Sequence, residues 1–239
     1  ALLRHVSEVL RSEFRSFDAA VRIDLLDRNL RMLDLDGDGR ADLLITEEDA
    51  LVWYHADKRG YQPAQRTLKP DDEERGPAIV FSEAEQTIFL ADMTGDGLID
   101  IVRIRNRDIC YWPNLGYGRF GAKVAMDHAP TFAPPDLFDA RYLHLADVSG
   151  TGTSDVLYLS PNGCTAYLNL SGNAWSDAQP VTPFFPTEQP NRLAITDLLG
   201  NGTACIVWSS TLPADAEAPM RYLDLMGGKK PHLLRKYVN

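Results

Sequence analysis

The stretch DLDGDGRAD, residues 34–42, decides the fold because it is the first of four related stretches in a chain of 239 residues. Each copy has an aspartate first and glycines at its fourth and sixth positions, and short apolar runs flank it. The leading aspartates lie 50 to 58 residues apart, and such a period indicates an array of similar structural units. The other copies are DMTGDGLID at 92–100, DVSGTGTSD at 147–155 and DLLGNGTAC at 197–205.

Each unit also has a third apolar run, beyond the strand that follows the loop. In the first three units an aromatic residue then closes the pattern, since Tyr61, Phe120 and Trp175 lie 19 or 20 residues past the last aspartate of the loop. Short runs rich in β-branched and aromatic residues, separated by polar turns, predict four strands per unit. The third runs are ALVWYHA at 50–56, DICYWPN at 108–114, CTAYLNL at 164–170 and MRYLDLM at 220–226.

The units together predict an all-β fold, a β-propeller of four-stranded blades. Fifteen prolines and seventeen glycines leave few uninterrupted windows for helices, which excludes a helical repeat. We expect the propeller to occupy residues 30–239, with repeats that start near residues 30, 88, 143 and 193. Four blades are compatible with part of a five-bladed ring. Residues 1–29 form an N-terminal segment that is either a closing strand or a cut edge.

Composition excludes several other classes of protein. The formal charge of −10 and the pI near 4.9 argue against nucleic acid as a partner, because phosphate binding requires clustered basic residues. The longest apolar runs have about five residues, far fewer than the ~18 of a membrane span, so we expect no direct membrane insertion. The three cysteines, Cys110, Cys164 and Cys205, lie in or beside apolar runs and are expected to be small buried residues.

The first loop has the spacing of a cation site. Asp34, Asp36, Asp38 and Asp42 occupy positions 1, 3, 5 and 9, and Arg40 at position 7 can offer its backbone carbonyl. Converging oxygen ligands suit Ca²⁺ better than Mg²⁺, which requires stricter geometry. Position 12 carries no bidentate glutamate, so the loop is not an EF-hand. The alternative is that the aspartates only cap turns by accepting backbone amide bonds.

The ligand set becomes poorer along the chain. The third loop keeps two aspartates and the fourth keeps one. Since the number of carboxylates tunes calcium affinity, we expect Ca²⁺ in the first two loops, an inadequate set in the third and none in the fourth. The second loop offers Asp92, Thr94, Asp96, Leu98 and Asp100.

Other motifs give no support to a catalytic or nucleotide site. GYGRFG at 116–121 matches GxGxxG, but no strand–helix unit surrounds it, and a hairpin turn explains its glycines. The five histidines show no paired metal spacing, and no GxSxG elbow occurs. We therefore expect that the chain is not an enzyme.

Longer motifs resemble a known family. The repeat resembles the FG-GAP/VCBS propeller repeat, so its units are similar to FG-GAP/VCBS-like four-stranded blades. The longer stretches are similar to the middle or N-terminal region of the B component of bacterial insecticidal toxin complexes (Tc toxins). These stretches are DEERGP at 72–77, RDICYWPNLGYGRFG at 107–121, TDLLGNGTACIVWSS at 196–210 and MRYLDLMGGKKPHLL at 220–234.

This resemblance implies a function. In that family the B component joins the C component in a cargo-holding shell, and its propeller docks and gates onto the channel-forming A component. The resemblance thus implies a non-catalytic scaffold of a secreted toxin complex, whose partners are the A component and the remainder of the shell. An alternative is a calcium-dependent adhesion or carbohydrate-binding propeller module, in which Trp53, Trp112, Tyr167 and Trp208 would line a sugar groove rather than the core.

Overall fold

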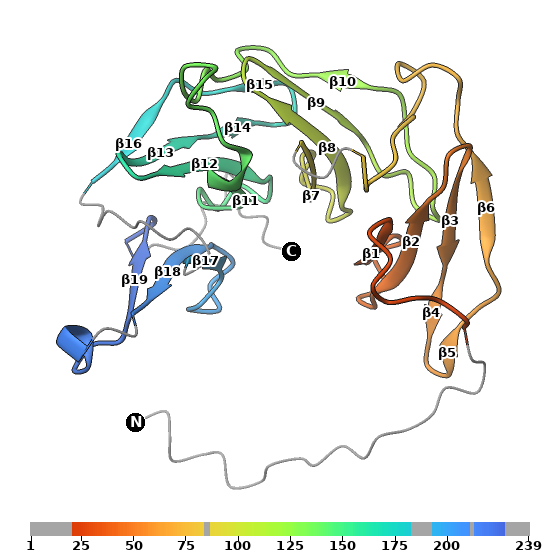
Figure 1. Cartoon of the computed structure of the whole chain (residues 1–239), viewed down its shortest axis with the longest axis horizontal. Coiled ribbons are helices and arrows are strands. Elements are labelled where there is room, and N and C mark those ends of the chain that lie inside the picture. Colours follow the sequence, from red (N-terminus) through yellow and green to blue (C-terminus); the bar gives the residue numbers. More distant parts are fainter. Residues whose placement is uncertain (1–20, 84–86, 183–192, 211–212, 228–239) are drawn as a thin grey trace, which may run out of the picture.

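The computed structural model describes residues 21–83, 87–182, 193–210 and 213–227, and its regular structure is almost entirely antiparallel β-sheet (Figure 1). Four sheets stand side by side as propeller blades around a common centre, which confirms the predicted all-β, propeller-type fold. The described blades form an arc that is open between the fourth blade and the first. In this part of the chain, no helix has the length and apolarity needed to cross a membrane. The helices η2 (Ala140–Tyr142) and η4 (Pro213–Asp215) have three residues each.

Blade 1 shows how the sequence repeat becomes a sheet. Its innermost strand and second strand are joined by the first nine-residue loop, and their register pairs Leu33 with Asp42. Consecutive strands are neighbours up to the third, as expected for short antiparallel connections. A small hairpin, β4 (Ala56–Asp57) and β5 (Gly60–Tyr61), precedes the outermost strand. In order from the centre the strands are β1 (Leu30–Leu33), β2 (Asp42–Thr46), β3 (Ala50–Tyr54) and β6 (Gln65–Leu68).

Blades 2 and 3 repeat this order, and blade 4 contributes three strands among the described residues. Their innermost strands β7, β11 and β17 face the centre (Figure 1). Blade 2 is β7 (Ile88–Ala91), β8 (Asp100–Arg105), β9 (Asp108–Trp112) and β10 (Val124–Ala125). Blade 3 is β11 (Leu143–Ala146), β12 (Asp155–Ser160), β13 (Gly163–Tyr167) and β16 (Gln179–Val181), with the hairpin β14 (Asn169–Leu170) and β15 (Ala174–Trp175). Blade 4 is β17 (Leu193–Thr196), β18 (Cys205–Ser209) and β19 (Met220–Asp224).

The N-terminal segment lies mostly outside the described residues. Residues 1–20, for which a closing strand or a cut edge was predicted, are not described, and residues 21–29 contain no strand.

Both faces of the middle strands of blades 2 and 3 are buried, because these blades pack against a blade on either side. Side chains alternate between the faces of a strand. In β8, Ile101 joins the core between blades 1 and 2, whereas Val102 and Ile104 join the core between blades 2 and 3. In β9, Trp112 faces blade 1 and Tyr111 faces blade 3. Apolar side chains occur on both faces of these strands because their blade lies between two other blades.

The cysteines and most of the repeated aromatic residues belong to these cores. Cys110, Cys164 and Cys205 are buried free thiols, as predicted. Burial raises the pKa of the Cys164 thiol to about 12, which makes it unreactive at neutral pH. Trp53 and Trp112 are fully buried in the core between blades 1 and 2, so they cannot line an exposed sugar groove.

An ion-pair network attaches the connection between blades 1 and 2 to the face of blade 2. Arg103, nearly buried on β8, bonds to the Glu73 carboxylate at 2.7 Å, and its guanidinium lies over the Trp112 ring. Trp112 Nε1 donates to the backbone carbonyl of Glu73 at 2.7 Å, and Lys123 from the outer part of the blade also pairs with Glu73. These cations, led by the Arg103 hydrogen bond, lower the pKa of Glu73 to about 2.

Replacement of this carboxylate should make stability less dependent on pH. A depressed carboxyl pKa contributes stability that is complete above the unfolded value of about 4.5 and is lost as the pH falls through about 2. We expect Glu73→Gln to lower the free energy of unfolding by about 1 kcal/mol at pH 7, a modest value because Glu73 is half-exposed. The difference from wild type should shrink below pH 4.5. Denaturant unfolding between pH 3 and 7 measures this. The exposed control Glu48→Gln should show no such pH trend, and a constant Glu73→Gln deficit would contradict the ion-pair explanation.

Candidate functional site

The first aspartate of each nine-residue loop closes the turn by accepting backbone hydrogen bonds. Asp34 accepts from the Gly37 amide at 2.7 Å and from the Gly39 amide at 2.8 Å. Both glycines have φ near +80°, which a residue with a Cβ rarely adopts. Burial disfavours the Asp34 carboxylate, but the amide bonds outweigh it and lower the pKa of Asp34. The same bonds join Asp92 to Gly95 and Gly97, and Asp147 to Gly150 and Gly152. In the fourth loop Asp197 accepts from Gly202 in the same way and from Asn201, at position 5.

The last aspartate of the first three loops is a buried joint between the loop and the third strand. Asp42 is fully buried and accepts from the Leu35 amide in its own loop and from the Ala56 amide just past β3, at 3.2 and 2.6 Å. Burial raises the pKa of Asp42, and in blade 2 it raises the pKa of Asp100 to about 6. The equivalent bonds join Asp100 to Met93 and Asn114, and Asp155 to Val148 and Asn169.

Two buried asparagines connect neighbouring blades. Asn114 donates from its side chain to the Leu35 carbonyl of blade 1, and Asn169 donates to the Met93 carbonyl of blade 2, at 3.3 and 3.0 Å. The side-chain oxygen of each also accepts a local amide bond, from Gly116 and Gly172 respectively. Sequence reasoning missed both asparagines, although each stands at the end of the third apolar run.

The second, third and fourth loops also bond to one another directly, so they form a row along the arc. Ser154 of the third loop donates its amide to the Asp92 carbonyl of the second at 2.7 Å. Ala204 of the fourth loop donates to the Asp147 carbonyl of the third, also at 2.7 Å. Each of these main-chain hydrogen bonds thus fixes the position of one loop relative to the next.

The turn that contains the predicted hairpin glycines packs against blade 1. Asn114 and Phe120 pair across the turn as in an antiparallel sheet, and the Leu115 amide donates to the Arg119 carbonyl. Residues 114–120 therefore form a tight turn, as expected. A Cβ at Gly118, where φ is +67°, would lie 2.3 Å from the Trp53 ring, so only glycine permits this approach.

The predicted cation ligands are brought together mainly in the first loop. Ligand oxygens of Asp34, Asp36 and Asp38 lie within 4.8 Å of one another. Arg40, expected to offer its carbonyl, also forms a side-chain ion pair with Asp38. Asp42 belongs to a second group, described below. In the described part of the chain, the second-loop aspartates Asp92, Asp96 and Asp100 form no such group of three.

His55 is a candidate ligand that the sequence did not reveal. It follows β3 directly, and its Nδ1 lies 3.0 Å from Asp36 Oδ2 and 3.5 Å from Asp42 Oδ1. One ligand atom from each of these three residues falls within 4.8 Å of the others. No local spacing could indicate this, because the register of β3 against β2 brings His55 beside the loop.

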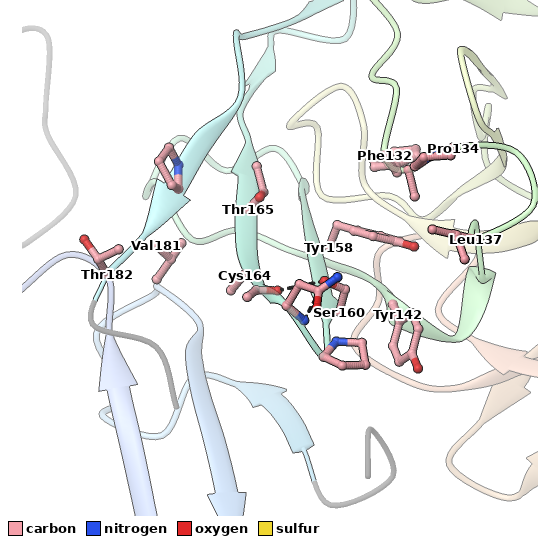
Figure 2. Close-up of a pocket in the computed structure, with 15 residues that line it drawn as sticks. Phe132, Pro134, Leu137, Tyr142, Tyr158, Ser160, Cys164, Thr165, Val181 and Thr182 are labelled. Atoms are coloured by element: carbon pink, nitrogen blue, oxygen red, sulfur yellow. Dashed lines mark hydrogen bonds between the residues drawn. The ribbon is translucent and has the colours of Figure 1, made fainter. Parts of the chain in front are cut away.

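A cavity of about 740 Å³ lies apart from the loops, between the connection to blade 3 and the outer strands of that blade (Figure 2). Tyr158 and Tyr142 contribute aromatic surface, and Thr165 and Ser160 contribute hydroxyl groups. The described residues that line it include no carboxylate, histidine, lysine or arginine. It therefore offers van der Waals and hydroxyl contacts.

Comparisons with known proteins agree with a propeller of this repeat type. An FG-GAP-like repeat profile matches residues 34–103, which include the first two loops. No curated protein matches the chain. Among solved structures, a Photorhabdus luminescens Tc holotoxin pore superposes on 82% of the chain with a TM-score of 0.63 and 21% identity. An Agrocybe aegerita lectin that recognises non-reducing terminal N-acetylglucosamine superposes on 75% with a TM-score of 0.56 and 24% identity.

A TcdB2–TccC3 crystal structure superposes on 82% of the chain with a TM-score of 0.50 and 16% identity. At these identities the similarity establishes the fold. The chain spans 9% of the pore chain, 46% of the lectin and 14% of the TcdB2–TccC3 chain.

Removal of the charge from the buried joint of blade 3 should destabilise the fold without any involvement of a cation. Asp155 accepts three amide bonds, from Val148, Ser149 and Asn169. In Asp155→Asn one acceptor becomes an NH₂ group, which leaves an amide donor unpaired at a cost of about 1–3 kcal/mol. We expect this loss in denaturant unfolding at pH 7, equal with and without EDTA. The free energy of unfolding of the exposed control Asp177→Asn should stay within about 0.5 kcal/mol of that of wild type. If Asp155→Asn were as stable as wild type, the structural role of Asp155 would be refuted.

Proposed function

We propose that the chain is a non-catalytic β-propeller scaffold of a secreted, insecticidal toxin complex. In this proposal it belongs to a B component, docks and gates onto the channel-forming A component, and forms part of the shell that holds the cargo with the C component. The observation that carries the proposal is the superposition of 82% of the chain on the Photorhabdus luminescens toxin pore. The sequence stretches that resemble the B component support it independently.

The loop end of the blades is the surface that suits a docking role. The nine-residue loops and the turns after the third strands lie at the same end of each blade, since the last aspartate of a loop bonds to the start of each turn. Large apolar side chains are exposed there, notably Tyr117 at 62% and Leu115 at 57%. Exposed apolar side chains on a rigid sheet framework are typical of a protein interface. Leu170, Leu198 and Leu199 add to this surface from the third and fourth units.

A binding experiment tests the docking face. We expect the full chain to co-purify with the A component of the organism that makes it, and Tyr117→Asn to weaken binding by about tenfold or more, as for a central aromatic contact. Asparagine tolerates the positive φ of 55° at this position, so the fold should remain intact. The matched control is Leu68→Asn, an equally exposed apolar residue on β6, at the far end of blade 1. Equal loss in both variants would contradict docking through the loop end.

The alternative function is a calcium-dependent adhesion or carbohydrate-binding module, and the similarity to the lectin favours it as the second candidate. A glycan array separates the two functions. Specific, calcium-dependent sugar binding without any affinity for the A component would favour the alternative.

We further propose that Ca²⁺ stiffens the first two loops. Three carboxylates of the first loop converge within 4.8 Å, an arrangement of hard oxygen donors that suits Ca²⁺ and that mutual repulsion would otherwise disfavour. The second loop retains Asp92, Asp96 and Asp100 in equivalent positions. A bound ion would add ligand-linked stability to the native state only.

Calcium should accordingly raise the thermal midpoint of the chain, and saturating EDTA should reverse this. Asp38→Asn together with Asp96→Asn should diminish the shift, because both residues are exposed and stand at position 5. Each accepts one amide bond, from Arg40 or Leu98, which the asparagine side-chain oxygen can also accept. Asp197→Asn in the fourth loop serves as the control and should leave the calcium-induced shift unchanged. A thermal midpoint that does not respond to EDTA would refute calcium binding.

A further inference from the structure

We propose that blade 1 carries a further cation site, formed by Asp36, Asp42 and His55, that takes a divalent first-row transition-metal ion such as Zn²⁺. This goes beyond the scaffold role. The site shares Asp36 and Asp42 with the ligands proposed for Ca²⁺ in the first loop, and His55 is the donor that distinguishes it. The three residues come from two segments: the nine-residue loop with the start of β2, and the residue just after β3.

The distances match those between ligands of one small ion. Nδ1 of His55 lies 3.0 Å from Asp36 Oδ2 and 3.5 Å from Asp42 Oδ1. Two ligand atoms bonded to one ion at about 2.1 Å lie roughly 3.0–3.4 Å apart for tetrahedral or octahedral angles. The observed separations therefore leave an ion within bonding reach of all three residues after small side-chain adjustments.

The two carboxylates of the site are buried, and one nitrogen beside them lacks a partner. The side chains of Asp42, Asp36 and His55 are 0%, 6% and 22% exposed. Nδ1 of His55 is itself buried, and despite its closeness to both carboxylates it makes no hydrogen bond of acceptable geometry in the described part of the chain. Asp42 accepts the Leu35 and Ala56 amides, but buried carboxylates are normally paired with a cation or bound to metal. A cation would give Nδ1 of His55 a partner and would neutralise both carboxylates.

The backbone and a neighbouring ring hold His55 in place. The carbonyl of His55 accepts from the Gln62 amide at 2.9 Å, and the next amide, that of Ala56, bonds to Asp42 at 2.6 Å. The imidazole packs edge-on against the fully buried Trp53, with centroids 6.1 Å apart. A ligand fixed in this way loses little entropy on binding.

The first unit departs from the others at two of the three ligand positions. In blades 2 and 3 the residue before the bonded amide is Pro113 or Leu168, and neither can bind a metal through its side chain. Position 3 of the loop is a carboxylate only in the first unit, as Asp36. Asp42 has a structural role that recurs with Asp100 and Asp155 in the next two blades. No such recurring role explains why Asp36 and His55 occur together.

The chemistry of the donors selects the ion. Ca²⁺ takes oxygen ligands, whereas Zn²⁺ combines imidazole nitrogen with carboxylate oxygen. Affinity among divalent ions rises from Mn²⁺ through Co²⁺ and Ni²⁺, and Zn²⁺ binds strongly without redox chemistry. Three protein ligands leave coordination positions for water or for a group from a partner protein.

The experiment uses the full chain, stripped with EDTA and titrated with Zn²⁺ by calorimetry and with Co²⁺ by visible absorption. We expect a Zn²⁺ affinity that falls by more than about tenfold in His55→Asn, since loss of even an outer-shell partner typically costs 10- to 100-fold. The matched control is His128→Asn, an exposed histidine whose φ of +58° asparagine tolerates, and it should bind like wild type. The Co²⁺ bands of an imidazole-bound ion should appear in wild type and disappear in His55→Asn.

Two results would overturn the site. If wild type binds no Zn²⁺, or if His55→Asn binds it within twofold of wild type, then His55 and Asp36 form a charge pair only. Asp36→Asn provides a second variant if His55→Asn fails to fold, and its Zn²⁺ affinity should fall likewise. His55 is not among the proposed calcium ligands, so His55→Asn should keep the calcium-induced rise of the thermal midpoint. That readout separates failure of the Zn²⁺ site from failure of the calcium proposal.

Discussion

One constraint organises this fold: the buried carboxylate at the end of each of the first three loops must accept amide bonds from both sides. Asp42, Asp100 and Asp155 each bond to the second residue of their own loop and to the amide just past the third strand. No other side-chain type combines two acceptor oxygens with so short a reach. The cost is visible in the pKa of Asp100, which burial raises to about 6. The connection between each of these loops and the third strand of its blade therefore depends on a buried carboxylate that water does not solvate.

The same joint links one blade to the next, which makes the arc rigid. The amide that bonds to Asp100 belongs to Asn114, whose side chain reaches the blade before it, and Asn169 repeats this one blade later. Blade 4 lacks the carboxylate, since Cys205 takes its place. Its link to blade 3 consists of the apolar core and the main-chain bond from Ala204. Coupling between blades is thus strongest in the middle of the described arc and weaker at its fourth blade.

The sequence predicts the blades well because their signals are local. Paired glycines four and six residues into each loop, flanked by apolar runs, specify turn and strands within a window of about 14 residues, and burial of the cysteines and of Trp53 follows from their apolar neighbours. The sequence cannot predict contacts that depend on register or on packing between blades. His55 meets Asp36 only because β3 pairs with β2, and Asn114 meets Leu35 across 79 residues. Both contacts require knowledge of which strand edge lies against which loop.

Structural and ion-binding roles overlap in the first loop, because Asp34 and Asp42 accept backbone amides and are also candidate cation ligands. Asp36 and Asp38 make fewer structural bonds: Asp36 accepts the Asp38 amide at 3.3 Å, and Asp38 accepts the Arg40 amide at 2.8 Å and pairs with its guanidinium. Blades 2 and 3 keep the closing and joining aspartates but have hydroxyl groups at position 3, and blade 3 also lacks a carboxylate at position 5, where it has Thr151. The number of cation ligands therefore varies between loops that share one turn. The Leu35 carbonyl of the first loop accepts from Asn114, which precedes the exposed Leu115 and Tyr117. An ion held in blade 1 would therefore stiffen the same end of the blades that carries these apolar side chains.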